Sequence, residues 1–186
     1  MRYNMKIQYI IGILIIWGLI SCSDRDENQE PTYGKVNVAL SVTLPEPESV
    51  HSLARSYTDS EIKNVDVLVF DEDGKFMERV KVDGGELTPS GTEISFSIRL
   101  DATSKRRVIH LVTNGRSPDG GTDRLNFNDI TSGMLESAAI PALGTTAMIF
   151  GSLEDQVMPL IMWGRVELPT GINIVTKADG VKLLRV

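Results

Sequence analysis

Apolar and polar residues alternate along much of this chain, and the alternation is clearest from Lys35 to Leu44. Every second residue of this segment is apolar, so that one face would carry Val36, Val38, Leu40, Val42 and Leu44. A period of two residues is typical of a β-strand with one buried face. Segment 92–100 alternates in the same way, whereas 107–113 is a continuous apolar run, which predicts a strand buried on both faces.

Turn residues separate further predicted strands at 61–70, 75–82, 160–168 and 172–175. Asp71–Gly74 is predicted to be the tight turn of a hairpin that joins the first two of these strands. One helix is predicted at 125–139, where apolar residues recur at helical spacing. Many short strands divided by turns favour an all-β fold, an antiparallel β-sandwich with one short helix.

The amino-terminal residues have the pattern of a bacterial lipoprotein signal. Arg2 and Lys6 precede an apolar run at 9–20, which is shorter than the roughly 20 residues that span a bilayer. Leu19-Ile-Ser-Cys22 then places a large apolar residue, a small residue and a cysteine around the cleavage point. We therefore expect Cys22, the one cysteine of the chain, to be acylated and to become the first residue of the mature protein.

These patterns divide most of the chain into three parts. Residues 1–21 are predicted to be the lipoprotein signal peptide, and the polar segment 22–34 is predicted to be a flexible tether. Residues 35–176 suit one β-sandwich domain of ordinary size.

Composition and residue types argue against several functions. The net charge is -6, and loss of a signal peptide with two cations would make the chain more acidic, which disfavours nucleic acid as a partner. The two histidines, His51 and His110, are not accompanied by the nucleophile motif of a serine hydrolase. No Cys–His cluster could bind zinc, and the acidic turn at 71–74 has Val82 where a calcium loop needs its last Glu. We therefore expect neither an enzyme nor a cofactor.

Several sequence features occur together in this chain. They are the lipoprotein motif at Cys22, an arginine in the polar loop after the first strand, and the segments Asp59–Gly74, Val108–Asn114 and Pro159–Gly164. In this combination the chain resembles the fimbrillin family, the subunits of type V pili in Bacteroidetes. The resemblance covers nearly the whole chain but only the amino-terminal half of the family's usual architecture. It implies a transthyretin-like sandwich followed by a second sandwich domain, for which residues 177–186 would be the opening.

The resemblance also implies a function. Members of the family are exported to the outer membrane as lipoproteins, and an arginine-specific protease then cuts the loop after the first strand. The departing strand leaves a groove, which a carboxy-terminal strand of another fimbrial subunit fills. The expected product is a structural subunit of surface fimbriae that serves adhesion. In this chain the cut would fall between Arg55 and Ser56, and until then the groove would be plugged by Val36, Val38, Leu40 and Val42.

Alternatives stay open at this point. Anchor subunits of the family keep their first strand, and an arginine in a polar loop is most often simply solvated. The chain ends before the domain that donates a strand, which a truncated reading frame, a partial gene model or a one-domain capping or anchoring subunit would each explain. The alternative function is a monomeric surface lipoprotein that binds a glycan or a partner protein. Its candidate aromatic residues are Tyr33 and Tyr57, because Trp163 is predicted to be buried.

Overall fold

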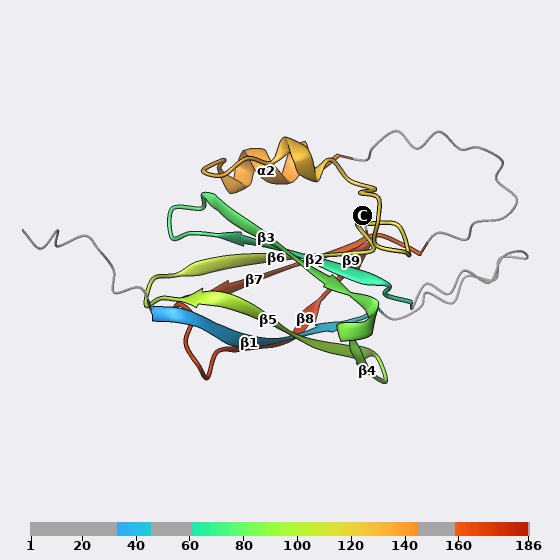
Figure 1. The fold of residues 1–186 in the computed structure, drawn as a ribbon, viewed down its shortest axis with the longest axis horizontal. Helices are drawn as coiled ribbons and strands as arrows, with labels where there is room; N and C mark the ends of the chain where they lie inside the picture. Colours follow the sequence, from blue (N-terminus) through green and yellow to red (C-terminus); the bar gives the residue numbers. More distant parts are fainter. Residues whose placement is uncertain (1–32, 46–60, 145–158, 186) are drawn as a thin grey trace, which may run out of the picture. The chain divides into compact units, whose positions relative to one another are not determined.

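The computed structural model describes residues 33–45, 61–144 and 159–185, which form two β-sheets packed face to face (Figure 1). The four-stranded sheet has the order β4-β5-β1-β8 and consists of β1 (Tyr33–Thr43), β4 (Thr88–Ser90), β5 (Glu93–Ala102) and β8 (Lys177–Lys182). The five-stranded sheet has the order β3-β2-β6-β7-β9 and consists of β2 (Asn64–Phe70), β3 (Phe76–Asp83), β6 (Arg107–Thr113), β7 (Met162–Leu168) and β9 (Leu184–Arg185). The helical elements are η1 (Gly84–Glu86), η2 (Phe127–Asp129) and α2 (Glu136–Ala142). The predicted all-β sandwich with one short helix is confirmed.

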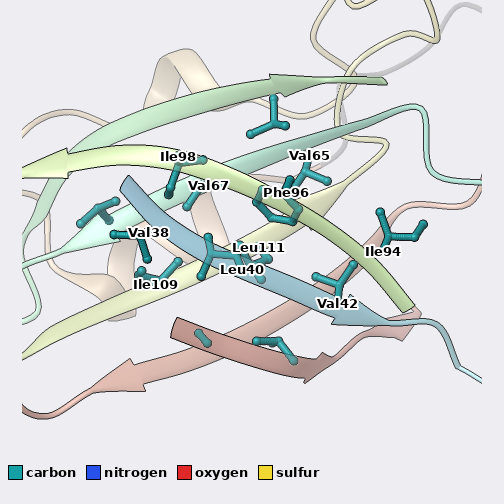
Figure 2. Close-up of a cluster of buried hydrophobic side chains, with 14 of the residues drawn as sticks. Val38, Leu40, Val42, Val65, Val67, Ile94, Phe96, Ile98, Ile109 and Leu111 are labelled. Carbon is teal, nitrogen blue, oxygen red and sulfur yellow. The ribbon is translucent and has the colours of Figure 1, made fainter. Parts of the chain in front are cut away.

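The main core lies between the two sheets and is built from alternate residues of their strands. Figure 2 shows labelled side chains from β1, β2, β5 and β6 that gather in one shared space between the ribbons. In β5 the buried residues are Ile94, Phe96, Ile98 and Leu100, and the residues between them point to solvent. The strand with one buried face that alternation at 92–100 predicts is therefore confirmed.

The centre of the five-stranded sheet is buried on both faces. Every residue of β2 and β6 is buried, and those that point inward belong to the core between the sheets. On the outer face, Leu68 and Val112 belong to a second apolar cluster, which Phe127 and Ala139 help to complete. The covering layer includes α2, which lies over this sheet (Figure 1). The continuous apolar run at 107–113 is thus a central strand covered on both sides, as its composition predicts.

The predicted helix at 125–139 is wrong over most of its length. Only η2 and the first residues of α2 fall inside it, and α2 continues beyond it. Gly133 has a φ of +82°, which an α-helix does not allow, and its amide donates to the Phe76 carbonyl oxygen at 2.8 Å. The apolar residues at helical spacing therefore fill the outer cluster from an irregular backbone. No helix in the described part of the chain is long and apolar enough to cross a membrane.

The predicted strand at 172–175 is also wrong. Ile172 makes a single bridge to Thr103, and the residues after it form a turn closed by the side chain of Asn173. Glycine is required immediately before this bridge, because a Cβ atom on Gly171, whose φ is +77°, would lie 2.1 Å from the Thr103 carbonyl oxygen. The chain regains extended pairing only in β8.

A buried charge cluster ties the segment after β6 to the outer face of the five-stranded sheet. Asp66 of β2 is completely buried, and its carboxylate accepts hydrogen bonds from Arg79 Nε at 2.9 Å and Arg116 Nε at 3.3 Å. Arg79 also donates to both carboxylate oxygens of Asp123, at 2.9 and 2.6 Å, and lies 3.5 Å from the centre of the Phe127 ring. Because two guanidinium groups surround it, the buried Asp66 carboxylate is compensated within the protein.

Removal of Asp66 should destabilise the fold far more than removal of an exposed carboxylate. Asp66→Ala would remove the buried carboxylate that both arginines share, although Arg79 keeps Asp123 and Arg116 keeps Asp83. We expect the free energy of unfolding to fall by about 1.5–3 kcal/mol, the contribution of a hydrogen bond to a charged group. Asp73→Ala is the matched control, because the Asp73 side chain is 64% exposed. An exposed ion pair such as that of Asp73 contributes about 0–1 kcal/mol. Urea denaturation measures both variants, and equal losses would contradict the compensating role of Asp66.

Candidate functional site

β1, which carries all four predicted plug residues, is an interior strand of the four-stranded sheet (Figure 1). It runs antiparallel to β5 over most of its length. On its other side it runs parallel to β8, between Ala39 and Thr43. This parallel pair departs from the predicted antiparallel arrangement. It arises because the crossover from β7 to β8 begins at the end of the sandwich where β1 also begins (Figure 1).

Three of the four predicted plug residues are enclosed in the core. Val38 and Val42 have no exposed surface and Leu40 has 1%, whereas Val36 is partly buried. Each plug residue lies opposite an apolar residue of β5. Val36 pairs with Leu100, and the pairs Val38–Ile98, Leu40–Phe96 and Val42–Ile94 are labelled in Figure 2. Cross-strand apolar pairs stabilise a sheet by about 0.2–1 kcal/mol each relative to alanine pairs. The alternation read from the sequence therefore corresponds to a continuous apolar contact along β1.

A polar residue that alternates with these core side chains connects β1 to both of its neighbours. Ser41 is 2% exposed; its hydroxyl donates to the carboxylate of Glu93 in β5 and accepts the amide of Gly180 in β8 at 2.7 Å. Opposite Ser41, β8 contains one extra residue, and Gly180 adopts a φ of +65°. A glycine with positive φ is typical of a β-bulge. Ser41 thus secures the position where the regular ladder between β1 and β8 is interrupted.

β1 also keeps β5 and β8 apart. Neighbouring strands in a sheet lie about 4.7–4.9 Å apart, so β5 and β8 flank a space about 9.5 Å wide, which one strand fills. If β1 were absent, the facing edges of β5 and β8 would present unpaired backbone groups beside apolar side chains. These are the properties of a surface that captures an extended segment.

The contribution of β8 to this site was not foreseen from the sequence. Its two buried apolar residues, Ala178 and Val181, are separated by three positions, because the bulge at Gly180 interrupts the period of two. Residues 177–182, which the family resemblance places at the opening of a second domain, thus complete the pairing of β1. The alternation of Val181, Lys182 and Leu183 is the local sequence signal for this strand.

The remaining predicted site residues lie outside the described part of the chain. They are Cys22, Arg55 and Ser56. Acylation of the cysteine and cleavage after the arginine therefore stay predictions. Tyr57, one of the candidate aromatic residues, also lies outside the described residues.

His110, which has no accompanying nucleophile motif in the sequence, is a buried residue of β6 with a partner at each ring nitrogen. Trp163 Nε1 donates to Nδ1 at 3.0 Å, so Nε2 carries the proton and donates to Glu136 Oε1 at 2.9 Å. Burial lowers the pKa of the His110 imidazole, and the hydrogen bond with Glu136 opposes this change. His110 is thus a neutral core residue, whereas His51 lies outside the described residues. Within the described ranges, no group of His, Cys, Asp and Glu side chains could hold a metal ion.

Comparison with known proteins relates this chain to proteins of bacterial fimbriae and adhesins. The family model described as fimbrillin-A associated anchor proteins Mfa1 and Mfa2 matches residues 27–155. A fimbrial assembly protein from Parabacteroides distasonis has a similar structure, with a TM-score of 0.53 and 15% identity, over 81% of this chain and 53% of that one. An adhesin candidate from Bacteroides thetaiotaomicron has a TM-score of 0.51 and 13% identity, over 85% of this chain and 47% of that one. The chain therefore spans about half the length of these structures, and at such identities the likeness concerns the fold. No curated protein sequence matches the chain significantly.

Charged residues on the core face of β1 should destabilise the uncleaved chain. Replacing Val38 and Leu40 together by Asp would bury two unpaired carboxylates, so we expect loss of the cooperative folded state. Asn37→Asp is the control, because Asn37 is exposed on the same strand. A change at such a surface position typically alters stability by less than about 0.5 kcal/mol. Thermal denaturation checks both variants. An unchanged midpoint in the double variant would mean that β1 is not part of the folded sandwich in solution.

Proposed function

We propose a strand-exchange function for this chain, which belongs to the family of fimbrillin-A associated anchor proteins and is a fimbria-associated surface protein. In this function, the four-stranded sheet would exchange β1 for a strand of another fimbrial subunit. The observation that carries this proposal is the position of β1. It is the interior strand between β5 and β8, yet in sequence it precedes the other described strands and is joined to β2 through residues 44–63. Those residues include Arg55. A cut there would leave β1 held by non-covalent contacts alone.

The energetics of β1 favour replacement over simple loss. Burial of a side chain such as Val or Leu stabilises a fold by about 1.5–3 kcal/mol, so Val38, Leu40 and Val42 together contribute about 5–9 kcal/mol. A whole domain is stable by only about 5–15 kcal/mol. An empty groove would therefore leave the sandwich close to unfolding. A strand with apolar residues at alternate positions would restore the core and the hydrogen bonds of β5 and β8 together.

Membrane attachment is the second part of the proposal. The lipoprotein motif at Cys22 would supply an acyl chain, and the polar segment 22–34 would tether the sandwich to the outer membrane. Until cleavage, β1 and the lipid belong to one covalent chain. After cleavage at Arg55 by an arginine-specific protease, the subunit would be attached to its anchor only through the non-covalent contacts of β1. Exchange of β1 for another strand would then release the subunit from the anchor and keep the groove filled.

The family description favours a second candidate function. A fimbrial anchor would keep β1 and its lipid, and Arg55 would be an ordinary loop residue. Such an anchor would contact the neighbouring subunit through a surface other than the β1 groove. The two candidates differ in the covalent structure of the mature protein, which makes them easy to separate.

The amino terminus of the surface protein distinguishes these candidates. For strand exchange we expect mass spectrometry of the surface-shed fraction to find a chain that begins at Ser56. A chain that still begins at acylated Cys22 would contradict cleavage and support the anchor. Cys22→Ala is the matched control for attachment, and we expect it to remove the protein from the membrane fraction in either case.

Strand exchange can also be measured directly on the purified protein. After cleavage at Arg55, a fluorescent peptide with the sequence of residues 33–45 should replace β1, because it offers the same contacts. Incorporation is measured by size-exclusion chromatography with fluorescence detection, and the uncleaved chain should take up far less peptide. A peptide with Val38→Asp and Leu40→Asp is the control. Equal incorporation of both peptides, or none by the cleaved chain, would contradict the mechanism.

A further inference from the structure

A hollow on the opposite side of the molecule from the four-stranded sheet has no part in strand exchange. It lies between the outer face of β6 and β7 and the helix α2, and its volume is about 520 Å³. Its walls include Trp163 and Arg165 of β7, together with Leu135 and Glu136 at the start of α2. Asp73, in the turn between β2 and β3, forms part of the rim. Small-molecule sites in proteins commonly have volumes of about 300–1,000 Å³.

The aromatic wall of this hollow is held in place by hydrogen bonds. Trp163 and Arg165 are two residues apart on β7 and therefore point to the same face of the sheet. The indole Nε1 donates to His110, and His110 in turn donates to Glu136. Arg165 Nε donates to the same Glu136 oxygen at 2.7 Å. A chain of four side chains from three elements thus fixes the orientation of the indole before any ligand arrives.

Two carboxylates that line the hollow can accept further hydrogen bonds. Glu136 Oε2 has one long contact, 3.5 Å from Arg165 Nη2, so its lone pairs are largely available. The Asp73 carboxylate is 64% exposed, and Leu135 is 51% exposed beside them. Trp163, which the sequence predicts to be buried, is partly buried: it packs against the outer cluster and also lines the hollow.

We propose that this hollow binds a neutral pyranose unit of a glycan. A pyranose has an apolar face of C–H groups, which suits an indole and a leucine side chain, and a rim of hydroxyl groups that donate and accept hydrogen bonds. Glu136 and Asp73 can accept from hydroxyl groups, and Arg165 can donate to them. Arg165 balances Glu136, and Lys75, whose Nζ lies 3.3 Å from the carboxylate of Asp73, balances Asp73. The site therefore has no excess positive charge that would favour an acidic sugar over a neutral one. The proposal stands independently of strand exchange, because the groove and the hollow use different sheets.

The sequence supplies a clean probe for this site. The chain has two tryptophans, and Trp17 lies in the predicted signal peptide, so Trp163 is the only one in residues 22–186. Tryptophan fluorescence of that chain, with Cys22→Ala to keep it free of lipid, therefore reports on the hollow alone. The probes are the methyl glycosides of glucose, galactose, mannose and N-acetylglucosamine. We expect a saturable change with at least one of them, with a Kd of about 1–10 mM, the range in which a single contact site binds.

Variants then locate the binding, with saturation-transfer NMR as the readout because it does not need the tryptophan. Trp163→Ala should abolish the transfer signal. Asp73→Asn with Leu135→Ala changes two exposed residues and should weaken binding several-fold without unfolding the protein. Met77→Ala is the control, because Met77 is an exposed apolar residue of β3 outside the hollow. Absence of saturable binding by all four glycosides would overturn the proposal, as would equal binding by the control and the Asp73–Leu135 double variant.

Discussion

The pairing of β1 with two strands that are distant in sequence is the constraint on which the four-stranded sheet depends. β5 is about 60 residues away and β8 about 140, yet their facing edges are joined through β1 alone in the described sheet. Neither partner can exchange hydrogen bonds with the other while β1 separates them. The sheet therefore needs a strand at this position, but the position does not require that the strand be covalently attached. Strand exchange is physically reasonable here because a strand from another chain could fill this position as well as β1 does.

The five-stranded sheet is organised in a different way, and it supplies the rigidity that an exchange would need. Its central strands β2 and β6 are covered on one face by the core and on the other by the segment that follows β6. The Asp66 cluster fastens that segment with charge-assisted hydrogen bonds, and α2 completes the layer. In the proposed exchange, the five-stranded sheet would thus stay folded while β1 is replaced. The same covering layer forms the hollow beside Trp163, so its outer surface is available for a separate binding role.

Prediction from sequence succeeded where structure depends on interactions close in the chain and failed where it depends on contacts between distant segments. Alternation located β1 and β5, and the unbroken apolar run located β6, because burial of one or two faces acts on each residue in its own strand. The helix predicted at 125–139 was wrong, because the apolar residues of this segment pack on the outer face of the sheet from an irregular backbone, and Gly133 prevents a continuous helix. β8 was missed for a related reason. Its bulge at Gly180 is stabilised by a hydrogen bond to Ser41, a residue far away in the chain, so the sequence of β8 alone does not reveal it.

The amino-acid sequence was enough to predict the sandwich class and the apolar face of β1, and its motif at Cys22 predicts a lipid. These properties are local, since they depend on the period of the side chains or on a short motif. The three-dimensional fold was needed to find that β1 lies between β5 and β8, that it runs parallel to β8, and that four side chains line one hollow, namely those of His110, Glu136, Trp163 and Arg165. The order of the strands and the meeting of these side chains depend on which distant segments pack against one another. The alternation of side chains within a single strand carries no information about the strand's partners.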